Sequence, residues 1–115
     1  MPNVLVTTAF GEGQLARLRR VSPRLTVARA EPETADYASA EILYAGVLPR
    51  DRSRAPRLQW VQVHMAGVNG LHDHPLYADA ALALTTASGV HAATVAEYAM
   101  TVLLALAHRV PRMVE

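Results

Sequence analysis

Residues 58–70 read LQWVQVHMAGVNG, and this stretch indicates the fold of the chain. Its first half is a short apolar run typical of a buried β-strand, and its second half is a loop of small residues. Four further short apolar runs predict strands at residues 4–8, 25–28, 42–44 and 82–85. Polar or helical segments lie between these runs. Such alternation is typical of a parallel α/β sheet covered on both faces.

Three segments between the predicted strands are candidates for helices. Residues 14–21 place Leu15 and Leu18 on one helical face. Residues 33–38 fit a short helix, and residues 49–55 are polar and fit a short helix or a surface loop. The 115 residues leave room for one domain. We therefore expect an α/β domain with a parallel sheet of about five strands and flanking helices.

The segment from Ala92 to about Arg109 predicts the longest helix. Its apolar side chains recur every three or four residues and extend over most of the circumference: Val95, Ala99, Met100, Val102, Leu103, Leu106, Ala107 and Val110. A helix that is apolar nearly all round is buried on more than one side. A five-stranded sheet covers one of those sides. We expect another lobe or another subunit to cover the rest.

Composition excludes several classes of function. The formal net charge of +1 is too small for a nucleic-acid-binding protein. The sequence has no Cys, which excludes disulfides and thiolate catalysis. It begins without the pattern of a signal peptide, and its longest apolar stretch, residues 99–107, is far shorter than the roughly 20 residues that span a bilayer. We expect no nucleic-acid partner, no membrane association and a cytoplasmic location.

A glycine motif near the N-terminus has the spacing of a dinucleotide fingerprint. Gly11-Glu-Gly-Gln-Leu-Ala16 matches G-x-G-x-x-[GA], and Glu31 follows about 20 residues later. Ala9 and Phe10 lengthen the loop after the predicted strand, however, and Glu12 places a carboxylate where the pyrophosphate charge would lie. We interpret the motif as a turn before a helix.

Two other segments are candidates for binding an anion. The loop of Ala66, Gly67 and Val68 follows a predicted strand directly, and its small side chains leave backbone N–H groups open to a carboxylate. Residues 85–97, TTASGVHAATVAE, form a strand end, a glycine loop and the start of a helix, where anions are favoured. His91 lies in this second segment. The alternatives are an ordinary tight turn and a structural or solvent-exposed histidine.

Another group of polar residues could suggest a metal site. His72 and His74 lie on either side of Asp73, just before Pro75. A third and a fourth ligand do not follow at a suitable spacing. We therefore predict no metal site.

Taken together, these segments resemble the NAD(P)-dependent D-2-hydroxyacid dehydrogenase family. The motifs are L-Q-W-V-Q, the loop A-G-V-N, and the helix T-T-A-S-G-V-H-A-A-T-V-A-E at the separation found in that family. The match runs from about Leu58 to Val110, and Asn69 stands where many members have Asp. The resemblance implies a flavodoxin-like catalytic domain into which a Rossmann cofactor domain is inserted, with the long helix crossing between the two lobes.

The resemblance also implies roles for individual residues. The backbone N–H groups of residues 66–68 would hold the substrate carboxylate, and His91 would contact the substrate. Thr94 and Val95 would lie near the nicotinamide end of the cofactor. The family's catalytic Arg, Glu and His, and its G-x-G-x-x-G, belong to sequence that follows Glu115. We therefore expect an incomplete substrate-binding domain over residues 1–115, with no Rossmann domain, no catalytic residue and no activity of its own.

The leading hypothesis for function is a fragment of an oxidoreductase. The complete enzyme would transfer a hydride between NAD or NADP and a small D-2-hydroxy acid or 2-oxo acid, with a cofactor domain and a second copy in a homodimer as partners. The alternative is a stand-alone, non-catalytic carboxylate-binding or interaction domain whose helix 92–109 is covered by a partner such as its own copy. A third hypothesis, a small nucleotide-binding domain, depends on Gly11 and Gly13.

Overall fold

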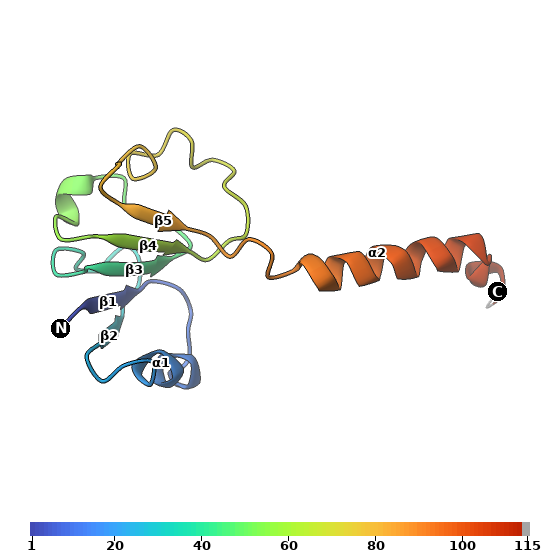
Figure 1. The fold of residues 1–115 in the computed structure, drawn as a ribbon, viewed down its shortest axis with the longest axis horizontal. Helices are drawn as coiled ribbons and strands as arrows, with labels where there is room; N and C mark the ends of the chain where they lie inside the picture. Colours follow the sequence, from blue (N-terminus) through green and yellow to red (C-terminus); the bar gives the residue numbers. More distant parts are fainter. Residues whose placement is uncertain (114–115) are drawn as a thin grey trace.

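The computed structural model describes residues 1–113, and a five-stranded parallel sheet forms its centre (Figure 1). The strands are β1 (Asn3–Val6), β2 (Thr26–Arg29), β3 (Ile42–Ala45), β4 (Trp60–Val63) and β5 (Ala83–Thr85). Their order is β2-β1-β3-β4-β5, and every neighbouring pair is parallel. This is the flavodoxin-like order. The predicted α/β fold with a five-stranded parallel sheet is confirmed.

Helix α1 (Glu12–Arg19) covers part of one face of the sheet. Its Leu15 is buried against Val4, Val6 and Val27, which point to this face from β1 and β2. The alternation of side chains along a strand explains why Leu5, between the two valines, belongs to the core on the opposite face.

Beside α1, the same face of the sheet is open. A groove of about 330 Å³ lies there, and its walls are almost entirely apolar. Leu18 and Val21 line it on the α1 side, and Ile42, Tyr44 and Trp60 line it on β3 and β4. We call this hollow the open groove.

The opposite face carries the larger core. Leu43, Val61 and Val63 are fully buried there. The cover consists of connecting segments that contain no α-helix: the residues on either side of the short 3₁₀ helix η1 (Arg52–Arg54), and the long segment between β4 and β5. Leu76, in that long segment, is 1% exposed. Side chains from loops therefore close most of this core.

The prediction of a short helix over residues 33–38 is wrong. The segment forms turns instead, because the carboxylate of Asp36 accepts a hydrogen bond from the N–H of Ala38 at 3.0 Å. The N–H of Thr34 donates to the carbonyl of Glu31 in a tight turn. Asp side chains that bond to the backbone two residues on favour turns over helices. The polar segment 49–55 does contain the predicted short helix, as η1.

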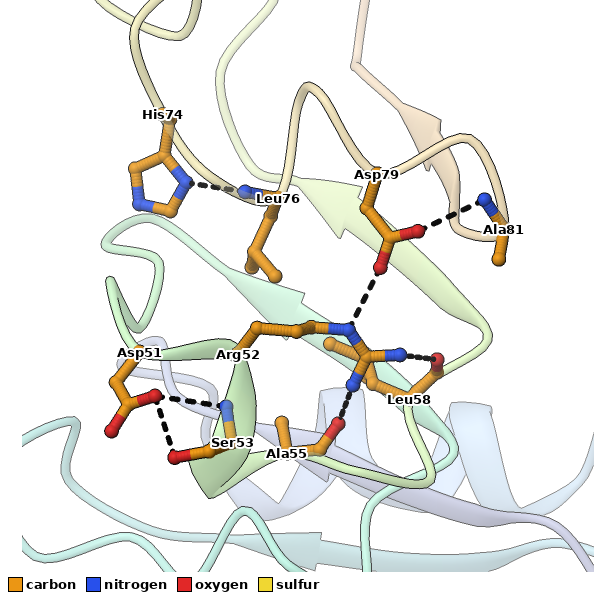
Figure 2. A network of polar contacts seen from close by, with 9 residues as sticks. All are labelled: Asp51, Arg52, Ser53, Ala55, Leu58, His74, Leu76, Asp79 and Ala81. Carbon is orange, nitrogen blue, oxygen red and sulfur yellow. Dashed lines mark hydrogen bonds and ion pairs between the residues drawn. The ribbon is translucent and has the colours of Figure 1, made fainter.

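A partly buried cluster of polar contacts ties η1 to the segment before β5 (Figure 2). The Nε of Arg52 donates to Asp79 at 2.9 Å, and its Nη2 donates to the carbonyl of Leu58 at 3.0 Å. Its Nη1 donates to the carbonyl of Ala55. Asp79 in turn accepts from the N–H of Ala81 at 2.9 Å. One guanidinium thus joins the two loop segments that cover the larger core.

Helix α2 (Ala92–Ala107) extends away from the sheet (Figure 1). Within residues 1–113 it contacts the short 3₁₀ helix η2 (Val110–Met113) and no other helix or strand. The radius of gyration is 19.3 Å, against about 13 Å for a compact domain of this length. The expectation that the sheet covers one side of this helix is therefore wrong for the described residues.

The helix ends two residues before the predicted end at Arg109. That residue adopts a φ of 56°, the left-handed conformation that commonly stops a helix. None of the helices formed by residues 1–113 has the length and apolar character required to cross a membrane.

Candidate functional site

The loop that follows β4 lies at the carboxyl end of the sheet, where ligands bind in folds of this class. Gly67 and Val68 are exposed, and Ala66 is half-buried. The backbone N–H groups of these three residues donate no hydrogen bond to any acceptor among residues 1–113. A Cβ atom built on Gly67 would meet no other atom within 4 Å. The loop therefore presents successive donors that no protein group occupies in the described part of the chain.

The second predicted segment lies beside this loop. The N–H of Ala87 donates to the carbonyl of Met65 at 3.0 Å, which joins the loop after β5 to the loop after β4. Gly89 has a φ of 87°, a conformation that glycine adopts without steric cost. This hydrogen bond places the start of the second segment, at Ala87, beside the loop after β4, whereas the end of that segment lies in α2.

The predicted residues around the start of α2 are all exposed. His91 is the residue just before the helix, and its side chain makes no capping hydrogen bond. Thr94 and Val95 lie in the first turn of the helix. All three side chains are accessible from outside the chain, as a contact to a substrate or to a cofactor requires.

The histidines before Pro75 have structural contacts instead of metal-ligand geometry. The ring of His72 packs edge-on against Tyr77, with 5.6 Å between ring centroids. The Nδ1 of His74 accepts a hydrogen bond from the N–H of Leu76 at 3.2 Å (Figure 2). Residues 1–113 contain no cluster of three or more side chains arranged to hold a metal ion.

The glycine motif at the start of α1 does not fit a pyrophosphate. The side-chain Oε1 of Gln14 accepts a hydrogen bond from the N–H of Gly11 at 2.9 Å and so occupies the N-terminus of the helix. Glu12 lies in the first turn and pairs with Arg19 at 3.2 Å. A bound phosphate would meet both a carboxylate and a carboxamide oxygen, and neither of these atoms can donate a hydrogen bond.

A row of rings at the carboxyl end of the sheet was not predicted from the sequence. The rings of Phe10 and Tyr44 lie 4.9 Å apart, and the hydroxyl of Tyr44 is 2.8 Å from the Nδ1 of His64. The row connects the ends of β1, β3 and β4, and it stops two residues before Ala66. The position of His64 directly after an apolar run was the signal in the sequence that could have indicated it.

One of three comparisons with known proteins found a match, and it agrees with the fold. No family model matches this sequence, and no curated protein matches it. Among solved structures, the phosphoglycerate dehydrogenase from Lactobacillus plantarum is similar, with a TM-score of 0.59 and 28% sequence identity. The similarity covers 90% of this chain and 34% of that chain. This chain thus spans about a third of the similar enzyme, and the predicted resemblance to the D-2-hydroxyacid dehydrogenases is confirmed in its structure.

Proposed function

We propose that this chain is the substrate-binding portion of an NAD(P)-dependent dehydrogenase that acts on a small 2-hydroxy or 2-oxo acid. The observation that carries the proposal is the row of unoccupied N–H groups at residues 66–68, at the carboxyl end of β4. Successive N–H groups form a concavity that favours an anion. The similarity to a phosphoglycerate dehydrogenase supports the same reading.

In the proposed enzyme these residues bind and orient the acid. The N–H groups of Ala66, Gly67 and Val68 would hold the carboxylate, which fixes the carbon next to it relative to the rest of the site. His91 would contact the substrate from the start of α2. Hydrogen bonds from backbone N–H groups to a carboxylate are charge-assisted, and such bonds are about twice as strong as neutral ones.

The described residues do not form a dinucleotide site by themselves. The start of α1 is occupied by the chain's own Gln14, and Thr94 and Val95 are the residues that we assign to the nicotinamide end. When bound in the complete enzyme, the nicotinamide would supply or accept the hydride. We therefore expect the isolated chain to bind the acid without oxidising NADH, and the complete enzyme to require a cofactor lobe.

The variant Gly67→Val tests the proposed carboxylate loop. We expect it to weaken binding of glyoxylate or pyruvate at least about tenfold, because a branched side chain would block access to the N–H groups and cost one good charge-assisted hydrogen bond. The fold should be retained, since a Cβ at this position meets nothing. Titration of the ¹⁵N-labelled chain, followed by the amide shifts of residues 66–68, measures both effects.

A matched control is Gly13→Val, because a Cβ at Gly13 also meets nothing within 4 Å. We expect this variant to bind the acid as the wild type does. If both variants bind equally well, the loop is not the carboxylate site. If Gly13→Val alone abolishes binding, the site lies at α1. The alternative, a non-catalytic binding domain, predicts the same titration but no NADH oxidation with glyoxylate, hydroxypyruvate or pyruvate in any longer form of the protein.

A further inference from the structure

The dipeptide Asn69-Gly70 directly follows the loop of residues 66–68, and both of its residues are exposed. Asn69 is one of two asparagines in the sequence. Glycine carries no side chain, so nothing shields its backbone nitrogen from the residue before it. The pair therefore places an accessible carboxamide next to an unhindered main-chain amide.

The structure leaves the amide of Gly70 free. Its N–H donates no hydrogen bond to any acceptor among residues 1–113. Gly70 has a φ of 77°, and a Cβ built on it would meet no other atom within 4 Å. Neither a hydrogen bond nor a packed neighbour in the described part of the chain holds this nitrogen in place.

The turn that contains the pair is closed by one hydrogen bond, from the N–H of Leu71 to the carbonyl of Val68 at 3.0 Å. Exposed loops of this kind open locally at little cost in free energy. The side-chain carbonyl carbon of Asn69 can therefore rotate toward the nitrogen of Gly70 with the loss of this one bond at most.

The reaction open to such a pair is ring closure. The nitrogen of Gly70 forms a bond to Cγ of Asn69, the bond from Cγ to Nδ2 breaks, and ammonia leaves with the amide proton. Water then opens the resulting five-membered succinimide at one of its two carbonyls, which gives aspartate or isoaspartate. The whole sequence consumes one water, releases one ammonia and needs no oxidant or reductant.

We propose that Asn69 is a site of spontaneous deamidation in the folded protein and converts to aspartate and isoaspartate by attack of the Gly70 amide. Either product adds one negative charge and so removes the formal net charge of +1. Isoaspartate also adds a methylene to the main chain. The proposal goes beyond the acid-binding function and does not depend on it.

The other asparagine is an internal comparison. Asn3 lies in β1, and its Nδ2 donates to the carbonyl of Ser39 at 3.1 Å. The next residue, Val4, is 9% exposed and has a branched, stiff side chain. Because the strand holds both reacting groups in place, we expect Asn3 to keep its amide.

The modification also has a consequence for acid binding, and this consequence rests on the proposed function. Asn69→Asp supplies the aspartate product in pure form, and we expect it to bind glyoxylate within about threefold of the wild type, since the added charge lies in water. The isoaspartate fraction should bind at least about tenfold more weakly, because a longer main chain displaces the N–H donors of residues 66–68.

Titration of the separated fractions measures this consequence. Equal binding by the isoaspartate fraction would contradict the consequence alone. A fresh chain that binds no acid would contradict the proposed function, whereas the deamidation of Asn69 is decided by mass and charge.

Peptide mapping of a chain kept for days at mildly alkaline pH tests the proposal. Trypsin separates the two asparagines into residues 1–17 and 58–109, because Arg is the only basic residue that it cleaves after in this sequence. We expect peptide 58–109 to gain the mass difference between a hydroxyl and an amino group and to divide into two products. Peptide 1–17 should stay unchanged.

The variant Asn69→Gln is the matched control, because its longer side chain would have to close a larger ring. We expect isoelectric focusing to show an acidic form that accumulates in the wild type and not in this variant. The proposal is overturned if Asn69 keeps its amide as long as Asn3 does, if it converts only in urea-unfolded chains, or if Asn69→Gln acidifies as fast as the wild type.

Discussion

Replacement of Leu76 by Ala is expected to lower the free energy of unfolding by about 3 kcal/mol. Leu76 belongs to the segment between β4 and β5, which has no helix or strand, yet its side chain is 1% exposed and packs in the larger core. Truncation removes buried methyl groups and leaves a cavity. The segment has few backbone hydrogen bonds to strands or helices. We therefore expect the side chains of Leu71, Leu76 and Leu82 to provide most of the contacts that hold it on the core.

Urea denaturation followed by circular dichroism measures this loss as a lower midpoint with an unchanged slope. The control is Leu104→Ala, which removes the same atoms from a side chain that is 53% exposed. We expect that control to change the stability by less than about 0.5 kcal/mol. Similar losses in the two variants would show that the 71–82 segment does not cover the core.

Replacement of Arg52 by Met is expected to cost about 2–3 kcal/mol. Methionine keeps an unbranched apolar side chain, but it removes the donors that reach Asp79, Ala55 and Leu58 (Figure 2). The carbonyls of two buried residues then lose a partner, and the carboxylate of Asp79 loses its counter-charge. Arg52→Lys should lie between the two, because an ammonium cannot reproduce three directed contacts. A Met variant as stable as the wild type would contradict this assignment.

The same contact predicts a dependence on pH. The hydrogen bond from Arg52, followed by that from the N–H of Ala81, holds the pKa of Asp79 below its usual value. A lowered pKa in the folded state gives stability that is present above the unfolded value of about 3.9 and is lost as pH falls through the folded value. Glu41 and Asp51 also have lowered pKa values. We expect the wild type to lose stability below about pH 4, and Arg52→Met to lose less over that range, as measured by urea denaturation at several pH values.

The regular elements of this fold could be predicted because each depends on residues close together in the sequence. The five apolar runs became five strands, and the 3–4 spacing after Ala92 became a helix. The prediction of a helix over residues 33–38 was wrong because a side-chain hydrogen bond of Asp36 favours a turn over the weak helical pattern. The position of α2 away from the sheet was not predictable, because helical spacing shows which residues form a helix and not what covers it.

The candidate site was predictable to the extent that it is built from backbone. Small residues after a strand predict open N–H groups, and those of residues 66–68 donate no hydrogen bond within the described residues, although their role in binding stays a prediction. The side-chain part was not predictable. Tyr44 and His64 lie 20 residues apart and meet because β3 and β4 are neighbours in a particular register. A single sequence does not reveal such a pair until the strand order is known.

The separation of α2 from the rest of the chain has a consequence for local unfolding. A lone helix of 16 residues is marginally stable in water. The central strands β1, β3 and β4, by contrast, pair with a neighbour on each side and pack their side chains into the cores on the two faces of the sheet. Backbone amides of the helix should therefore exchange with deuterium quickly, by fraying, while those of the central strands wait for global unfolding. The protection of α2 thus reports whether anything covers it, independently of what the covering molecule is.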